Sequence, residues 1–309
     1  MKTHRLSHLF FIGLLCLFLF LLTGCSGGGS SREAASSFSP GKTSVLVPAS
    51  PGTKTLGGDP LLLDISNVEQ GYFTGILKKN DSRINIQVLG PDGITYKYFL
   101  EEADVETVFP LTAGNGTYTI MAFENVSEDQ YASLFAEVFD VELSDEFLPF
   151  LYPNQFVNFD ENSRAAALAA ELTAEVTSDL EALTVIYEYV ISHISYDNEK
   201  AATVSGNYLP DIDATLASGT GICFDYASLT TAMLRSVGIP AKLAIGYSGD
   251  IRHAWIDVYI QSMGWVEKAI EFKGDEWKLM DPTFASTGTD ESILEYIGDG
   301  DNYILEYER

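Results

Sequence analysis

The sequence predicts an α+β protein, in which helices and an antiparallel sheet follow a small all-β sandwich. Three observations carry this prediction. Short apolar runs separated by turn residues fill the region from Leu61 to Leu143, which is typical of a sandwich. Helical periodicity begins after Asn162, and strand-like runs return after Gly238. Because these helices precede the strands instead of alternating with them, we expect their sheet to be antiparallel.

The amino terminus has the pattern of a secretory signal. Two basic residues precede an apolar run from Leu9 to Leu22, which is too short to cross a bilayer comfortably. The run ends in Leu22-Thr23-Gly24-Cys25, which resembles the bacterial lipobox and implies cleavage after residues 1–24 and acylation of Cys25. An ordinary signal peptide with a chance cysteine is the alternative. We expect a protein anchored by lipid to the cell membrane and facing outward, on its extracellular or periplasmic side.

The next segment, residues 25–58, is rich in glycine, serine, proline and threonine. Such a composition buries too little apolar area to fold, so we predict a flexible tether. Residues 59–145 then carry the sandwich, with strands predicted at Gly71–Leu77, Arg83–Leu89, Ile94–Leu100, Val105–Leu111, Gly116–Phe123 and Leu134–Val141. A spacer role and a ligand-binding role for this sandwich are equally open.

Residues 146–309 form the second predicted domain. An alanine-rich helix over Ser163–Val176 comes first, and Ser178-Asp179-Leu180-Glu181 has the form of a capping box that opens the next helix. A third helix over Cys223–Val237 is stopped by Gly238 and Pro240. The strands predicted after it are Ala241–Tyr247, Ala254–Ile260, Trp265–Phe272 and Glu276–Met280.

The formal net charge is −26, and it becomes −28 when Lys2 and Arg5 leave with the signal. So acidic a surface argues against nucleic acid as a partner and against electrostatic binding to anionic lipid. We interpret the carboxylates as a solvated surface, with attraction of cationic substrates as the alternative.

Counting cysteines and histidines narrows the possible chemistry. Of three cysteines, Cys16 is lost with the signal and Cys25 is acylated, which leaves Cys223 as the free thiol. The histidines outside the signal are His193 and His253. We expect His193, in the middle of a helix, to be a surface or packing residue.

Cys223 follows Gly221-Ile222 and begins an apolar helix pattern. The helix dipole and unpaired backbone N–H groups there favour thiolate, which is the nucleophilic form. A cysteine nucleophile needs a base and a group that orients the base. His253 lies at the start of a predicted strand and Asp281 at the end of another, so the three residue types can converge. The alternative for Cys223 is a small buried core residue.

Several ordered motifs resemble the bacterial transglutaminase-like core. They are Gly219-Thr220-Gly221-Ile222-Cys223-Phe224-Asp225-Tyr226-Ala227-Ser228-Leu229, Gly238-Ile239-Pro240-Ala241, His253-Ala254-Trp255 and Trp277…Asp281-Pro282-Thr283, with Ile194-Ser195-Tyr196-Asp197 in the preceding helix. The resemblance covers roughly Ser178 to Ser286 and implies a papain-like fold. It also implies that Cys223 is the nucleophile, His253 the base and later the acid, and Asp281 the orienting group. One departure is the long stretch Trp265–Trp277, which we interpret as an added hairpin.

The implied activity is acyl transfer from an amide through a thioester, on a protein or peptide substrate that can include cell-wall peptide. Water gives hydrolysis, as in a cysteine protease, and a lysine amine gives a crosslink, as in a transglutaminase; the triad is the same for both. The alternative is a catalytically degenerate binding module that recognises a cell-wall or host ligand. No cofactor is expected, and the oligomeric state stays open. Gly298-Asp299-Gly300-Asp301-Asn302 has the look of a calcium turn, but we favour a solvated acidic turn and predict no metal.

Overall fold

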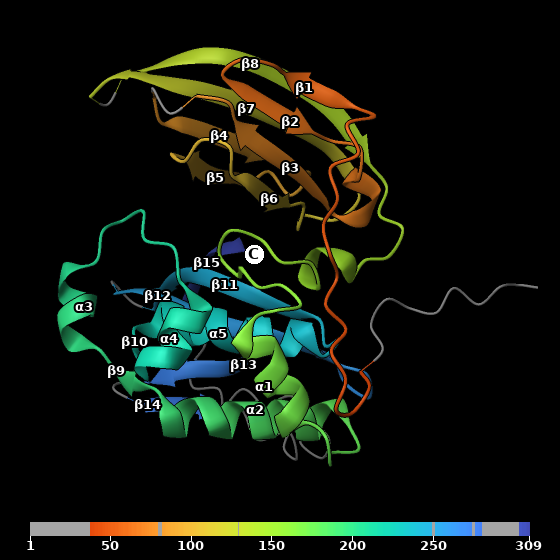
Figure 1. The fold of residues 1–309 in the computed structure, drawn as a ribbon, viewed down its shortest axis with the longest axis vertical. Coiled ribbons are helices and arrows are strands. Elements are labelled where there is room, and N and C mark those ends of the chain that lie inside the picture. The colour runs from red at the N-terminus through yellow and green to blue at the C-terminus, as the bar shows by residue number, and fades with distance from the viewer. Residues whose placement is uncertain (1–37, 80–81, 129, 249–250, 274–275, 280–302) are drawn as a thin grey trace, which may run out of the picture. The chain divides into compact units, whose positions relative to one another are not determined.

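The computed structural model describes residues 38–79, 82–128, 130–248, 251–273, 276–279 and 303–309. Within them, the predicted α+β class and the preceding all-β sandwich are confirmed (Figure 1). Across these residues, no helix combines the length and the apolar character needed to cross a bilayer. Cys25 and the predicted signal lie outside the described residues.

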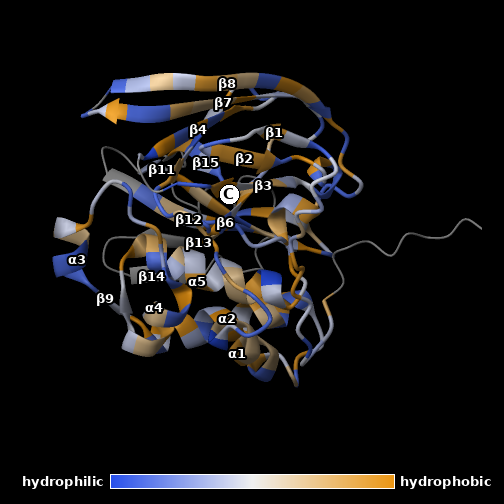
Figure 2. Ribbon diagram, turned by 45° about the horizontal axis from the view of Figure 1, so that its top comes forward, coloured by the Kyte–Doolittle hydropathy of each residue, from blue (hydrophilic) through white to orange (hydrophobic). Residues whose placement is uncertain are grey.

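The sandwich consists of two antiparallel sheets. One joins β1 (Thr55–Gly57), β2 (Leu61–Asp64), β3 (Tyr72–Leu77) and β6 (Glu106–Pro110) in that order. The other joins β5 (Thr95–Leu100), β4 (Ile84–Leu89), β7 (Gly116–Ser127) and β8 (Gln130–Val141). Burial alternates along β4, and Figure 2 shows hydrophilic and hydrophobic residues interspersed along β7 and β8. The buried residues of both sheets form one apolar core, in which the rings of Phe73 and Phe109 stack with centroids 4.9 Å apart.

The flexible tether predicted over 25–58 is wrong for its described part, residues 38–58. The N–H of Ser44 donates to the carbonyl of Ser236 at 2.7 Å. Further along, the N–H of Gly52 donates to the carboxylate of Asp64 at 2.6 Å. Backbone groups that find partners far away in the sequence order this segment, although its composition favours disorder.

The second domain begins with helices. They are α1 (Arg164–Leu172), α2 (Asp179–His193), α3 (Asn198–Thr203), α4 (Ile212–Ser218) and α5 (Cys223–Ser236). A short 3₁₀ turn, η2 (Leu148–Phe150), precedes α1, and another, η1 (Val68–Gln70), lies between β2 and β3 of the sandwich. The capping box is present in part, because the Ser178 hydroxyl accepts from the Glu181 N–H at 3.2 Å. Helix α5 contacts β11 (Ala241–Ser248) and β12 (Ile251–Ile260) as well as α1, α2 and α4 (Figure 1).

Helix α5 is the centre of this domain. It is buried at every position from Asp225 to Ser236, including several polar residues such as Ser228 and Arg235. It ends as predicted at Gly238, which has a φ of 84°, and the Ile239 N–H donates to the Leu234 carbonyl. A central, well-terminated helix gives its first residue a fixed position.

The helices pack with a five-stranded antiparallel sheet in the order β14-β13-β12-β11-β15. Its other strands are β13 (Gly264–Lys273), β14 (Glu276–Leu279) and β15 (Tyr303–Glu308). β13 and β14 pair as antiparallel neighbours, which confirms the predicted added hairpin. β15 was not predicted, and it pairs with β11, some sixty residues away in sequence, so no local signal announces it.

Helix α2 ends at His193, whereas the family resemblance places Ile194–Asp197 within this helix. Ile194 is extended, and Ser195–Tyr196 form the short strand β9, which pairs in parallel with β10 (Thr220–Gly221). His193 is therefore the last residue of the helix and not a mid-helix residue. It is exposed, as expected, and its ring stacks on Tyr189 with centroids 3.9 Å apart.

Candidate active site

Cys223 is the first residue of α5, as predicted. Ile222 before it is extended, and its N–H donates to the Asp225 carboxylate at 2.8 Å. Gly221 leaves no room for a side chain, because a Cβ there would lie 2.7 Å from the Asp225 Cβ. The tight turn and its carboxylate cap fix where the helix starts, and therefore where the thiol lies.

Burial raises the pKa of the Cys223 thiol above its ordinary value, and the nearby Asp225 carboxylate adds to the effect. The backbone N–H groups of Ala254, Phe224 and Cys223 lower the pKa, but they do not offset the burial. Burial therefore opposes the effect of the helix start that the sequence predicts, and the raised pKa favours the thiol form of Cys223. Its proton must be removed by a base.

His253 lies in β12, opposite Gly246 of β11. Its side chain is buried, with 6 % exposed. The backbone N–H of the next residue, Ala254, lowers the pKa of the Cys223 thiol, and His253 and Cys223 line the same pocket. The structure thus brings two of the three predicted residues together.

Gly246 shows why this strand pair can pack so closely. A Cβ there would lie 2.0 Å from the Ile304 carbonyl oxygen and 2.9 Å from the Trp255 ring. Only glycine lets β15 and Trp255 approach β11 at the level of His253. Trp255 is itself buried.

Asp281, the third predicted residue, lies outside the described residues, as do Pro282 and the acidic turn Gly298–Asn302. The complete triad therefore stays a prediction. In the part of the chain that is described, no group of His, Cys, Asp and Glu is arranged to hold a metal ion.

A charged cluster beside the cysteine was not predicted. The Asp225 carboxylate is fully buried and accepts from the Lys200 ammonium at 2.7 Å and from the Tyr208 hydroxyl. Lys200 also donates to the Tyr208 oxygen at 2.8 Å. An acidic residue in the first helical turn is a recognisable signal, but its partners come from the α3 segment and cannot be found by spacing.

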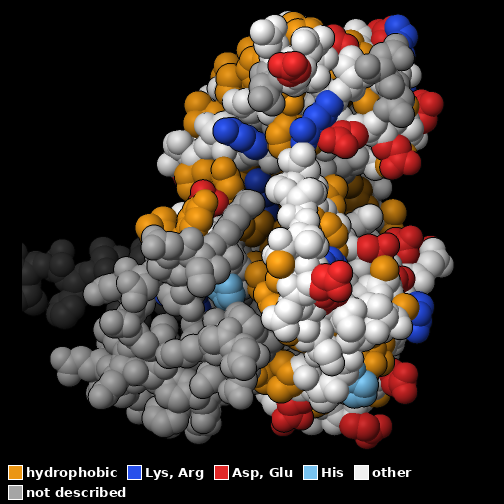
Figure 3. Space-filling view, turned by 90° about the vertical axis from the view of Figure 1, so that its left-hand side faces the viewer, with side chains coloured by type: hydrophobic (Ala, Val, Ile, Leu, Met, Phe, Trp, Pro, Cys, Tyr) orange, Lys and Arg blue, Asp and Glu red, His pale blue; other side chains and the backbone are white. Residues whose placement is uncertain are grey.

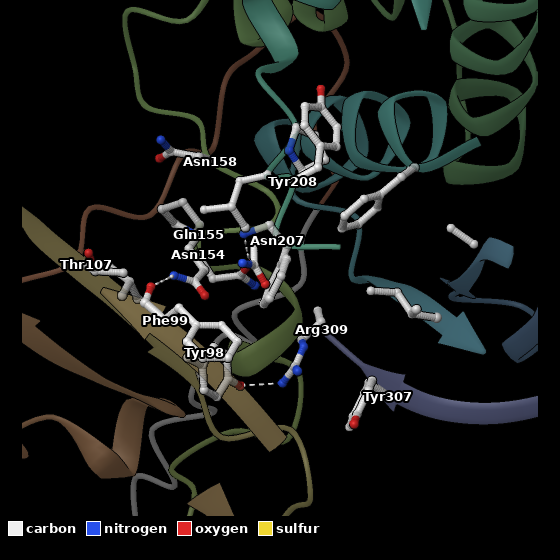
Figure 4. Close-up of a pocket in the computed structure, with 18 of the residues that line it drawn as sticks. Tyr98, Phe99, Thr107, Asn154, Gln155, Asn158, Asn207, Tyr208, Tyr307 and Arg309 are labelled. Carbon is white, nitrogen blue, oxygen red and sulfur yellow. Dashed lines mark hydrogen bonds between the residues drawn. The ribbon is translucent and has the colours of Figure 1, made fainter. Parts of the chain in front are cut away.

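Cys223 and His253 line a pocket of about 1280 Å³. Figure 4 shows other residues of its lining, among them Tyr208 and Arg309. Part of the lining comes from the start of α5 and from β11 and β12, and part from the segment around Tyr208. Other lining residues come from β5 and β6 of the sandwich, from residues 153–160, and from the end of the chain at Tyr307 and Arg309. The sandwich therefore shares the pocket of the candidate active site, a feature that the sequence does not reveal.

The surface of the described part carries many carboxylates, in keeping with the net charge of −26. Figure 3 shows acidic side chains scattered over one face, with fewer lysines and arginines. At the pocket, the carboxylates of Glu101, Glu102, Glu106 and Asp160 are exposed.

Residues 166–268 match the family model described as the Transglutaminase-like superfamily. This match contains Cys223 and His253 and ends before Asp281. It confirms the transglutaminase-like domain that the motifs predict. At this coarse level it supports an enzyme of the cysteine type.

Two curated relatives align with part of the chain. Mouse kyphoscoliosis peptidase is 27 % identical over 141 residues, which are 42 % of this chain and 19 % of that protein. The uncharacterized protein YebA of Bacillus subtilis is 22 % identical over 185 residues, 53 % of this chain and 25 % of that protein. The alignments thus span a quarter or less of either relative.

Two solved structures are also similar to this chain. A candidate cysteine protease from Cytophaga hutchinsonii gives a TM-score of 0.36 at 14 % identity, covering 77 % of this chain and 83 % of that one. Red sea bream transglutaminase gives 0.26 at 14 % identity, covering 69 % and 48 %.

Proposed function

We propose that the protein is a cysteine-dependent enzyme that acts on amide bonds of proteins or peptides through a thioester. The observation that carries the proposal is that Cys223, at the start of α5, and His253, in β12, line the same pocket although they come from separate elements. Their common pocket of about 1280 Å³ is large enough for a peptide segment. Asp281 is proposed as the group that orients His253.

The raised thiol pKa gives His253 a necessary role. As the Cys223 sulfur attacks the amide carbonyl, His253 accepts the thiol proton, and a tetrahedral intermediate with an oxyanion forms. Backbone N–H groups at the start of α5, including that of Cys223, are placed to stabilise this oxyanion, and each such donor contributes about 3 kcal/mol in comparable sites.

The intermediate collapses when the C–N bond breaks, and His253 returns the proton to the departing amine. The thioester on Cys223 then reacts with water, which gives a carboxylic acid, or with a primary amine, which gives a new amide. In both cases the thiol regains its proton. We propose hydrolysis as the main outcome and transamidation as the alternative.

Placement at a membrane is part of the proposal. The Leu22-Thr23-Gly24-Cys25 sequence supports acylation of Cys25 and anchoring of the enzyme on the outer side of the cell membrane. Radiolabelled palmitate should enter the wild-type protein expressed in a bacterial host and should not enter Cys25→Ala; equal labelling of both would refute the anchor.

A peptide library incubated with the protein tests the reaction. Mass spectrometry with and without a primary amine distinguishes new termini, deamidated glutamines and amine adducts. We expect products that disappear in Cys223→Ser. If Cys223→Ser forms the same products, or if the wild-type protein binds peptides and forms none, the chain is not this enzyme, and the second result supports the degenerate binding module.

A further inference from the structure

Two buried hydrogen-bond donors in the lining of the pocket have no acceptor among the residues that the structure describes. They are Nε of Arg309 and Nδ2 of Asn154. Arg309 is 2 % exposed and Asn154 is 3 % exposed, and both line the pocket that contains Cys223 and His253. Buried polar groups are nearly always paired, because an unpaired donor costs free energy. This wall therefore lacks an acceptor that a ligand can supply.

The guanidinium of Arg309 is held in place without being neutralised. Its Nη1 donates to the Tyr98 hydroxyl at 2.6 Å (Figure 4). Its Cζ lies between 4.4 and 4.9 Å from the centroids of four rings, those of Tyr96, Tyr98, Phe156 and Tyr307. None of the ion pairs found among the described residues includes it. The rings attract a cation but offer Nε no hydrogen-bond acceptor in its plane.

The backbone of Arg309 fixes where this charge lies. Its N–H donates to the Leu243 carbonyl at 2.8 Å, and its own carbonyl accepts from the Leu243 N–H at 2.9 Å. The same carbonyl accepts from Nη2 of the buried Arg235 at 2.6 Å. The side chain therefore starts from a rigid point on β11 and reaches Tyr98 in the sandwich strand β5.

The orientation of the Asn154 amide follows from its hydrogen bonds. Its Oδ1 accepts from the N–H groups of Phe156 and Val157 at 2.9 and 3.1 Å. Because those two donors require the oxygen, the nitrogen is left as the free end of the amide. Phe156, whose N–H binds the Asn154 oxygen, also has its ring 4.8 Å from the Arg309 Cζ.

This part of the pocket is close to the cysteine helix but separate from the sulfur. The ring of Phe224, the residue after Cys223, lies 6.1 Å from the ring of Phe156. A ligand group bound at Arg309 lies beside the Phe156 ring. It belongs to a part of the substrate that is remote from the carbonyl under attack.

We propose that Arg309 and Asn154 form a subsite for a carboxylate of the peptide substrate, on the sandwich side of the pocket. A carboxylate has two oxygens and can accept from both donors, and its hydrogen bonds to a guanidinium are charge-assisted. The exposed carboxylates at the pocket are solvated and screened, so they weaken the attraction little. The inference rests on the proposed function only for the identity of the ligand as a substrate.

Binding can be measured without turnover in the full chain carrying Cys223→Ala. The probes are acetyl-Phe-Gly with a free carboxylate and the same dipeptide as its amide, because the pocket is rich in aromatic rings. By titration calorimetry at neutral pH, we expect the carboxylate form to bind about tenfold more tightly than the amide.

Two matched variants test the assignment. Asn154→Asp keeps the oxygen that accepts from the Phe156 and Val157 N–H groups but replaces the free donor with a second oxygen, so the preference for the carboxylate form should vanish. Asn158→Asp adds the same charge at an exposed position in the same lining and should keep the preference. Thermal unfolding verifies that both variants fold, and Arg309→Lys, which keeps the charge but lacks Nε, should also reduce the preference.

Equal binding of the two probes, no binding of either at millimolar concentration, or a preference that survives Asn154→Asp would each overturn the subsite. The proposed enzyme function fails separately. If Cys223 forms no acyl-enzyme but the protein still binds the carboxylate probe more tightly than the amide, the proposed chemistry is refuted and the subsite stands. An active enzyme without that preference refutes only the subsite.

Discussion

Two opposing effects act on the pKa of the Cys223 thiol. The helix start and the N–H groups of Ala254 and Phe224 favour the thiolate, whereas burial and the Asp225 carboxylate favour the thiol. The sequence predicts the first effect, because glycine, cysteine and an apolar helix pattern are adjacent. It does not predict the second, because burial depends on residues that fold over the thiol. The resting thiol makes His253 necessary as a base.

Alkylation by iodoacetamide measures this balance. In the unliganded protein, we expect the rate at Cys223 to rise with pH and to reach half its maximum above about 8.5, the ordinary value for a free thiol. Peptide mapping by mass spectrometry from pH 6 to 10 assigns the label, and Cys223→Ser is the control for other thiols. A half-maximum below pH 7 would contradict the raised pKa and indicate a resting thiolate.

Asp257 provides a second test at this scale. Burial raises the pKa of its carboxyl group from 3.8 to about 7, although the Lys268 N–H donates to it at 2.7 Å. Between these two values the folded protein keeps a proton that the unfolded chain has released, so the contribution of Asp257 to stability falls as pH rises. In Asp257→Asn the amide oxygen can still accept from Lys268, so this loss should disappear.

Urea unfolding at pH 5 and pH 8 gives the free energy of unfolding of wild type and of Asp257→Asn at each pH. We expect the free energy of unfolding of the variant, relative to that of wild type, to be roughly 2–4 kcal/mol higher at pH 8 than at pH 5. A constant difference between the two proteins would show that the carboxyl group is ionised throughout.

The elements of the fold differ in how far they can be predicted. The sandwich strands β3 to β8, together with α2, α5 and β11 to β14, carry their own periodicity and stop signals, and the structure confirms them with changes at the ends. β1 and β2 were not predicted. α3, α4 and β15 are short, and long-range contacts stabilise them. The order of residues 38–58 likewise depends on partners such as Ser236 and Asp64 that are remote in sequence.

The start of α5 shows how such contacts serve the site. Its carboxylate cap, Asp225, is fully buried and is compensated by Lys200 and Tyr208 from the α3 segment. That pairing connects one side of the pocket to the cysteine helix. A buried carboxylate that loses its cation is strongly destabilising, whereas removing both charges costs less.

Lys200→Met should therefore lower the free energy of unfolding by roughly 2–4 kcal/mol, and adding Asp225→Asn should recover part of it. Chemical denaturation of both single variants and the double variant gives the coupling energy. Lys79→Met is the control, because the Lys79–Asp59 pair has a similar length of 2.7 Å but is more than half exposed. A Lys200→Met variant as stable as Lys79→Met would refute the structural role of the buried pair.

On the scale of the whole molecule, one fully buried arginine connects parts that are remote in sequence. Arg235 in α5 donates to the carbonyl oxygens of Ala241 at 2.9 Å, Tyr152 at 2.8 Å and Arg309 at 2.6 Å. Burial lowers the pKa of its guanidinium to about 9. These bonds hold the segment before α1, the start of β11 and the end of β15 on one helix.

Replacing Arg235 with methionine leaves these three carbonyl groups without their donor. We expect the free energy of unfolding to fall by about 3–5 kcal/mol. Removal of the buried charge offsets part of this loss, because the desolvation cost of the guanidinium disappears with it. Arg164→Met, at an exposed position, should change it by no more than about 0.5 kcal/mol. Similar unfolding midpoints for the two variants would show that Arg235 does not hold these segments together.

The candidate site could be predicted in part at this scale. Cys223 and His253 stand in local motifs, and the structure brings them into one pocket. The contribution of β5, β6 and Arg309 could not be predicted, because it depends on how the sandwich strands and the end of the chain meet the catalytic domain. Asp281 lies outside the described residues, so its role depends on experiment.

The central claim is that Cys223 forms a covalent acyl-enzyme. Intact-protein mass spectrometry after acid quenching of a reaction with the peptide library measures this directly. We predict an added acyl mass that maps to Cys223, is released by hydroxylamine, forms much more slowly in His253→Ala and is absent in Cys223→Ser. Turnover of the same peptides without any adduct on Cys223, or turnover that persists in Cys223→Ser, would contradict it.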